Sequence, residues 1–274
     1  MSGEFLLGGD SQMSHNKQED EVNETLRTIH ELRTTHGNFL DKPLPDADLQ
    51  TVLDASVRAG NASNMQSYSI VVVTDRGVMK TVCGYQASAL LLYCIDTNRM
   101  ADLARHLGCR FAQDPAWLAT TGAVDTVMAA QTAVIAARSL GIDSLFTNGI
   151  HRGDPERVFA ALDLPERNCL PLIALLLGYP DKPVARRKGR LNGPGIVHHG
   201  RYHRLSAAEC DAVVAEYDAP QRHLGLVEDW REKGAAHYLE WLFTRKPFDA
   251  DTEPLSAMSI TLRKHGFIHA IPEK

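Results

Sequence analysis

Residues 125–149 hold the pattern that most restricts the fold, because a helix, a glycine, a strand and a turn follow one another without interruption. Apolar residues recur at helical spacing from Thr121 to Leu140, and Gly141 stands where a left-handed cap would end the helix. The run from Ile142 to Phe146 is short and apolar, as a buried strand is. A turn at 147–149 follows, and its exposed backbone could meet a planar ligand.

The predicted helix carries an apolar stripe, which we expect to face the core. The stripe consists of Val124, Val127, Met128, Val134 and Ile135. Gln131 interrupts it, and a polar group in such a place needs a partner. We expect a hydrogen bond to neighbouring backbone there rather than a contact with a ligand.

Three more short apolar runs are predicted strands, at 69–74, 90–95 and 172–177. Helical patterns precede them, one through Leu26, Ile29 and Leu32 and a second that starts near Pro45. Leu49, Val52, Leu53 and Ser56 form one face of the second helix. The order of these elements predicts a mixed sheet that helices cover on both faces.

Composition limits the class of protein. The chain has 274 residues, of which 44% are hydrophobic and 23% charged, so one globular domain over 21–274 is expected after a disordered polar leader at 1–20. The net charge of -5 argues against binding to nucleic acid or to an anionic membrane surface. No apolar run approaches the ~18 residues needed to span a bilayer. Five cysteines without a Cys-x-x-Cys pair fit reduced thiols, so we expect a cytoplasmic protein.

Basic residues gather at Ala185-Arg-Arg-Lys-Gly-Arg190. Most such runs are solvated turns, but Lys and Arg beside a turn also bind phosphate. A guanidinium and two hydroxyls at Arg33-Thr34-Thr35 directly follow a predicted helix and form a second candidate anion contact. The residues alone leave both interpretations open.

Five motifs in order resemble the nitroreductase family of FMN-dependent oxidoreductases. They are Arg33-Thr-Thr-His-Gly-Asn-Phe39, Ala59-Gly-Asn-Ala-Ser-Asn-Met-Gln66-Ser-Tyr68, Asp125 to Gly149, Gly178-Tyr-Pro180 and Lys188-Gly-Arg190. The continuation through Trp230 to Phe267 is similar to the NADPH-flavin oxidoreductase and oxygen-insensitive nitroreductase branch, with a carboxyl extension at 198–274. The resemblance implies an α+β homodimer, a mixed sheet flanked by helices, and two FMN sites between the subunits.

The resemblance also implies which residues hold the cofactor. Arg33, Thr34, Thr35, Lys188 and Arg190 would surround the FMN phosphate. The ring and ribityl chain would run past Gly60, Asn61 and Ala62, with Gln66 and Gln86 as further polar contacts. Thr147, Asn148 and Gly149 match the segment whose backbone amide, that of Gly149, points at flavin N5. Arg222 would meet the phosphate of the nicotinamide dinucleotide.

The chain departs from the family pattern in three places. Thr34 and Gly37 stand where the family carries cations, and the stretch from Gly84 to Cys94, which holds Gln86, is shorter than usual. In the segment 218–226 the branch has several arginines, of which only Arg222 remains beside a histidine.

The implied activity is transfer of hydride from NADPH or NADH through flavin N5 to a small flat aromatic acceptor, such as a nitroarene, a quinone or a flavin, by a ping-pong mechanism. No catalytic side chain and no metal is required. Two alternatives stay open: a flavin-sequestering protein without efficient turnover, and a dehydrogenase or reductase of a specialised metabolite.

Overall fold

The computed structural model describes residues 23–112, 114–184, 186–244 and 256–268, so the predicted leader at 1–20 lies outside the described residues. Four strands form one antiparallel sheet in the order β1-β2-β4-β3. They are β1 (Tyr68–Val73), β2 (Ala89–Asp96), β3 (Asp143–Thr147) and β4 (Cys169–Gly178). All four predicted strands are confirmed. The sheet differs from the expected mixed one, since the single parallel pairing among the described residues is the Thr34–Ser144 bridge.

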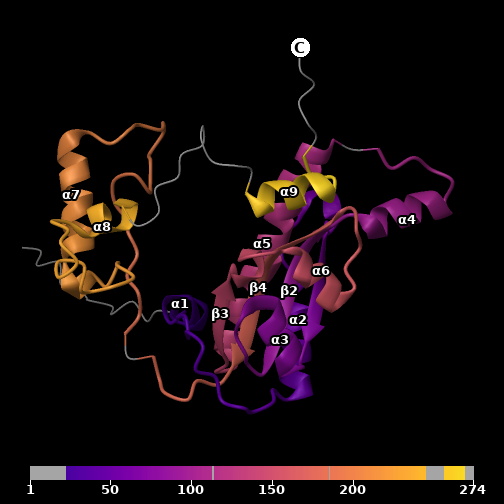
Figure 1. The fold of residues 1–274 in the computed structure, drawn as a ribbon, viewed down its shortest axis with the longest axis horizontal. Coiled ribbons are helices and arrows are strands. Elements are labelled where there is room, and N and C mark those ends of the chain that lie inside the picture. The colour runs from indigo at the N-terminus through magenta and orange to yellow at the C-terminus, as the bar shows by residue number, and fades with distance from the viewer. Residues whose placement is uncertain (1–22, 113, 185, 245–255, 269–274) are drawn as a thin grey trace, which may run out of the picture.

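Helices cover both faces of the sheet, as predicted (Figure 1). One face packs against α2 (Asp46–Ser56) and α5 (Pro115–Ser139), and the other against α3 (Arg76–Cys83) and α6 (Glu156–Leu162). Alternate residues of each central strand serve the two faces: Leu91 and Tyr93 pack toward α5, while Leu90 and Leu92 pack toward α3. The expected α2 is confirmed, including the burial of Val52 and Ser56.

The remaining elements lie around this layered body. They are α1 (Glu24–His30), η1 (Ala62–Asn64), α4 (Asn98–His106), η2 (Gly149–His151), α7 (Ala207–Asp218), η3 (Pro220–Arg222), α8 (Tyr238–Thr244) and α9 (Ala257–Lys264). In Figure 1, α7 and α8 form a group beside the sheet, whereas α9 lies over one end of it. Within the described part of the carboxyl extension at 198–274, Trp230 and Tyr238 are buried.

The burial of α5 corrects the sequence prediction. Its core face is made of small residues such as Ala129, Ala130 and Ala133, while Val124 and Val127 are about half exposed. Small side chains let the helix axis approach the sheet closely, so the larger apolar residues of the predicted stripe turn outward. Only Val134 of that stripe is buried in the core.

Length and composition make α5 the one described helix that could cross a membrane, although we expected no segment of that kind. The helix instead contacts α2 and all four strands of the sheet. These contacts are those of the core helix of a globular protein.

Candidate cofactor site

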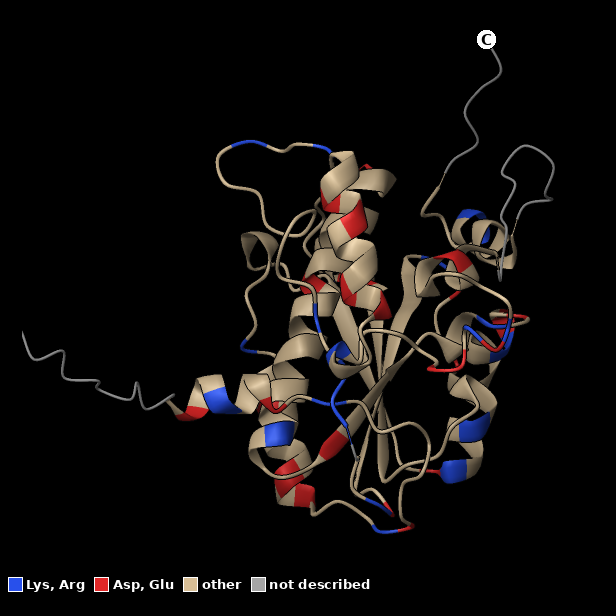
Figure 2. Ribbon diagram, turned by 90° about the vertical axis from the view of Figure 1, so that its left-hand side faces the viewer, with Lys and Arg blue, Asp and Glu red and all other residues tan. Residues whose placement is uncertain are grey.

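A cavity of about 1140 Å³ opens beside β3 and the carboxyl end of α5. Its described lining contains many cations and no carboxylate. The Lys and Arg residues that line it are Arg33, Arg186, Arg187, Lys188, Arg190 and Arg222. They come from three segments far apart in the sequence, at 33, 186–190 and 222. Figure 2 shows the Lys and Arg residues of the chain in blue. This convergence makes the cavity a candidate site for an anion.

The basic loop at 186–190 is fixed by the extension. The Gly189 amide donates to the His223 carbonyl at 3.2 Å, and the Arg222 guanidinium donates to the Arg190 carbonyl at 3.3 Å. Lys188 donates to the Gly225 carbonyl. A Cβ at position 189 would stand 2.0 Å from the Arg222 carbonyl oxygen, so only glycine allows this backbone contact. Lys188 and Arg190 therefore reach the cavity on a braced loop rather than a free one.

Arg33 enters the cavity wall with a buried partner. Its Nε and Nη2 lie 3.0 and 2.9 Å from carboxylate oxygens of Asp143, whose side chain is 1% exposed. Arg138, near the end of α5, donates to the same carboxylate at 3.1 Å and to Glu31 at 3.1 Å. One carboxylate thus binds two guanidiniums at the edge of the cavity.

The neighbours of Arg33 differ from the expected arrangement. Thr34 is exposed and lines the cavity, whereas Thr35 is 3% exposed. The Thr35 hydroxyl donates to Asp143 at 3.0 Å, and its amide donates to the Ser144 carbonyl at 2.9 Å. Thr35 lies behind the cavity wall because the extended segment turns alternate side chains to opposite sides.

The segment from Gly60 to Ser67 is held by a second buried carboxylate. Asp125 of α5 is fully buried and accepts the amides of Ala62 at 2.9 Å and Ser67 at 3.2 Å. Asn61 accepts the Gln66 amide at 3.1 Å. Gln66 has a φ of 51°, which lies in the left-handed region. Gly60, Asn61 and Ala62 therefore form a fixed turn at least partly open to solvent, outside the lining of the cationic cavity.

In the turn after β3, a backbone amide forms a hydrogen bond within the turn itself. The Gly149 amide donates to the Thr147 hydroxyl at 2.9 Å, and a Cβ at position 149 would lie 2.3 Å from the Cys83 carbonyl oxygen. In this arrangement the Gly149 amide is occupied within the protein, in contrast to the expectation that it points at a ligand. Asn148 is the exposed residue of the turn. Burial raises the pKa of the Cys83 thiol beneath it, which keeps that thiol neutral.

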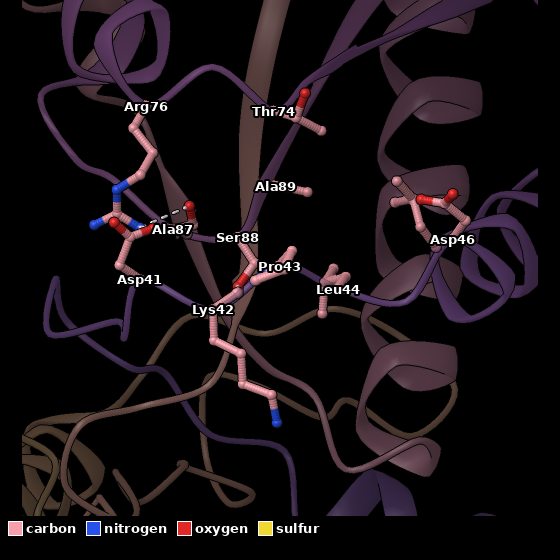
Figure 3. A pocket seen from close by; sticks show the side chains of 11 residues that line it. Asp41, Lys42, Pro43, Leu44, Asp46, Thr74, Arg76, Ala87, Ser88 and Ala89 are labelled. Carbon is pink, nitrogen blue, oxygen red and sulfur yellow. Dashed lines mark hydrogen bonds and ion pairs between the residues drawn. The ribbon is translucent and has the colours of Figure 1, made fainter.

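Gln86 lies away from the other expected contacts. Its side-chain amide donates to the Arg76 carbonyl at 3.0 Å. The next residues, Ala87 and Ser88, line a separate cavity of about 320 Å³ between the starts of α2 and α3, shown in Figure 3. There Arg76 lies 3.5 Å from Asp41, and Lys42 is the other cation.

Three polar residues matter more than the sequence suggested. Asp125 holds the turn at 60–67, and Asp143 holds the Arg33 side chain. Gln131 lines the cationic cavity instead of bonding within the core. A carboxylate in an otherwise apolar helix or at the start of an apolar strand was the available signal, because buried charges need partners. The sequence pattern marked Gln131 as an interruption of the apolar stripe but could not indicate that it is exposed on the cavity wall.

Comparison with known proteins agrees with this geometry. A model of the nitroreductase family matches residues 31–107. The chain is 32% identical over 223 residues to the NADPH-flavin oxidoreductase of Vibrio harveyi, covering 77% of this chain and 90% of that protein. It is 32% identical over 192 residues to the oxygen-insensitive NADPH nitroreductase of Salmonella typhimurium, covering 66% of this chain and 77% of that protein.

Solved structures show the same fold. NfrA2 of B. megaterium superposes with a TM-score of 0.72 at 25% identity, covering 89% of this chain and 98% of that chain. The NADPH:FMN oxidoreductase of Vibrio harveyi, solved with NAD+, gives a TM-score of 0.71 at 24% identity, again covering 89% and 98%. The fold is therefore the α+β fold of these enzymes, and the chain belongs to the nitroreductase family.

Proposed function

We propose that this protein is an FMN-dependent oxidoreductase that uses NADPH or NADH to reduce small flat aromatic acceptors. The observation that carries the proposal is the convergence of Arg33, Lys188 and Arg190 on one cavity whose described lining has no carboxylate. The names of the relatives, NADPH-flavin oxidoreductase and NADPH nitroreductase, support the same chemistry.

The residues present fit the phosphate of FMN. Arg33, Lys188 and Arg190 supply charge, and the exposed Thr34 supplies a hydroxyl on the same wall. A hydrogen bond to a charged group contributes about 1.5 to 3 kcal/mol. Thr35 contributes through Asp143 and not by direct contact, since it is buried.

The ring end of the proposed site consists of turns. Gly60, Asn61, Ala62 and Gln66 form one, held by Asp125, and residues 147–149 form the other. Fixed backbone dipoles stabilise charge on a bound ring without reorganising. Asn148 takes the place expected of Gly149 as the group that faces the ring, because it is the exposed residue of its turn. Gln86 is not part of the proposed cofactor site.

Bound FMN would supply the redox chemistry, which is transfer of hydride from a nicotinamide through N5 to an oxidised acceptor in a ping-pong sequence. The protein's part is to bind and orient. Arg33, Lys188 and Arg190 would hold the phosphate end of the cofactor, and the two turns would limit movement of its ring. The exposed face of the ring would leave room for one flat molecule after another. Nitroarenes, quinones and free flavins all satisfy that shape.

Arg222 is the candidate contact for the dinucleotide phosphate. It lines the cavity, but its Nε lies 2.6 Å from a carboxylate oxygen of Glu216. The Glu216 carboxylate offsets the charge of Arg222, so the pair presents little net charge to a ligand. We therefore expect a preference for NADPH over NADH of less than about tenfold.

A homodimer completes the proposal. The outer face of α5 exposes Trp117, Val124, Val127 and Met128, and exposed apolar patches mark interaction surfaces. Sedimentation at micromolar concentration should return a dimer, and a monomer alone would contradict the homodimer.

Residues 21–274 would form one FMN-binding domain, with 198–274 as an extension to it. A cytoplasmic location agrees with five free cysteines.

The visible spectrum of the purified protein tests the main proposal. Incubation with FMN followed by gel filtration should leave a yellow protein, and anaerobic NADPH or NADH should bleach it rapidly. Bleaching by dithionite but by neither nicotinamide would favour a flavin-sequestering protein. Reduction coupled only to a particular metabolite would favour a specialised reductase. A colourless protein after incubation with excess FMN would contradict all three.

A further inference from the structure

Asp143 is the most heavily engaged buried carboxylate in the described part of the chain. It is the first residue of β3, and its side chain is 1% exposed. Its oxygens accept from Arg33 Nε at 3.1 and 3.0 Å, from Arg33 Nη2 at 2.9 Å, from Arg138 Nη1 at 3.1 Å and from the Thr35 hydroxyl at 3.0 Å. A buried charge requires such partners, and one of them, Arg33, also lines the cationic cavity.

The contact with Arg33 is side-on. It uses the Nε and Nη2 edge of the planar guanidinium and therefore fixes the orientation of that plane. Within the described residues Nη1 donates no hydrogen bond, and Arg33 lines the cavity. A guanidinium has five N–H donors, so the donors on Nη1 remain for an anion.

The backbone beside Arg33 is fixed to the same strand. Thr34 forms a bridge with Ser144, and the Thr35 amide donates to the Ser144 carbonyl at 2.9 Å. Arg138 ties the end of α5 to Asp143 and to Glu31. Three elements thus meet at one carboxylate, and the segment that carries Arg33 and Thr34 has a defined position before any ligand binds.

We propose that Asp143 is a positioning residue for the anion subsite: it holds the Arg33 guanidinium so that its free edge meets the phosphate. The proposal rests on the proposed function for the identity of the anion. Without the carboxylate, the guanidiniums of Arg33 and Arg138 would face each other with no anion between them. Their repulsion would move Arg33, which has the more exposed side chain at 26% against 18%.

Asp143→Asn tests the proposal, because it keeps the shape of the side chain and removes its charge. Quenching of flavin fluorescence gives the dissociation constants of FMN and of riboflavin, which lacks the phosphate. We expect FMN to bind about tenfold more weakly and riboflavin to stay within about twofold of the parent protein. An equal loss for both flavins, or FMN binding that is unchanged or tighter, would overturn the proposal.

Asp96→Asn is the matched control. Asp96 lies at the end of β2, accepts the hydroxyl of Ser69 at 2.5 Å and does not line the cavity. It should change neither flavin constant. If Asp143→Asn does not fold, Thr35→Val removes one donor to Asp143 with little change of shape and should weaken FMN binding about threefold while sparing riboflavin. Equal effects of Thr35→Val on both flavins would overturn the proposal.

Failure of this inference differs from failure of the proposed function. If the parent protein binds FMN but the variants bind it as tightly, only the role of Asp143 is lost. If the parent protein binds neither flavin, the proposed function is lost instead.

Discussion

Two buried aspartates organise opposite kinds of structure in this molecule. Asp125 lies in the middle of α5 and accepts two backbone amides, so it shapes a turn. Asp143 lies at the start of β3 and accepts two guanidiniums and a hydroxyl, so it orients side chains. The ring end of the proposed site therefore depends on backbone geometry, whereas the phosphate end depends on charge.

The difference teaches how the two ends should respond to change. A fixed backbone turn tolerates few substitutions and responds little to salt, because its hydrogen bonds are short-range and at least partly buried. Cationic side chains on a braced loop tolerate changes of shape but lose effect when their charge is removed or screened. FMN and riboflavin separate the two ends experimentally, since only FMN carries the phosphate.

The largest expected effect is that of Asp125→Ala. The substitution leaves the buried amide of Ser67 without a partner, at a cost of about 1 to 3 kcal/mol, and the half-buried amide of Ala62 without one at a smaller cost. Urea unfolding of the apoprotein should show a loss of about 1 to 5 kcal/mol, and both flavins should bind more weakly. Asp125→Asn, which retains one acceptor oxygen, should lose less. A loss below about 1 kcal/mol for Asp125→Ala would mean that the turn does not depend on this residue.

Arg190→Ala should affect the phosphate end alone. Removal of a charge-assisted contact should weaken FMN binding by about 1.5 to 3 kcal/mol, which is roughly 10-fold to 150-fold, while riboflavin binding stays unchanged. Fluorescence titration with both flavins measures the difference. Arg201→Ala removes an exposed arginine outside the cavity and serves as the control. Unchanged FMN affinity in Arg190→Ala would remove this residue from the site.

Gly149→Ala should affect stability through backbone packing. The added Cβ would lie 2.3 Å from the Cys83 carbonyl oxygen, so the turn or α3 must move. Overpacking of this kind costs about 1 to 3 kcal/mol, which thermal or urea unfolding would detect. Gly153→Ala gives a comparison at a glycine with no atom within 4 Å of a built Cβ, although its φ of 67° adds some strain. Equal stability of Gly149→Ala and the parent protein would show that the contact relaxes freely.

The smallest effect is expected for Gln86→Ala. Its side chain is bonded to the Arg76 carbonyl near the separate cavity of Figure 3, so FMN and riboflavin constants should both stay within about twofold. A loss confined to either flavin would return Gln86 to the site and would require a different arrangement of the loop around it.

The four strands and α2 could be predicted because the apolar residues of each one form a pattern typical of a single kind of element, either a strand or a helix. The outward turn of Val124 and Val127 could not, because α5 is apolar on both sides. Hydropathy alone does not distinguish a face that meets a sheet through alanines from a face left for another surface.

The candidate site could be predicted only in part, because some of its features depend on local sequence and others on contacts between distant segments. Cations near turns made Arg33, Lys188 and Arg190 candidates, and the resemblance to the nitroreductase family implied that they hold a phosphate. The structure brings all three to one cavity. The opposite orientation of Thr34 and Thr35 depends on the pairing of their segment with Ser144, which is a contact across more than a hundred residues. A sequence pattern cannot supply such a long-range register.

The contact between Gly189 and the Arg222 carbonyl has a consequence for the order of events during synthesis. Because the loop takes its shape from residues 222–225, the anion pocket cannot be finished until that later part of the chain has left the ribosome. The sheet can form before then, so a nascent chain should acquire its layered body first and its capacity to retain a phosphorylated ligand only near the end of translation.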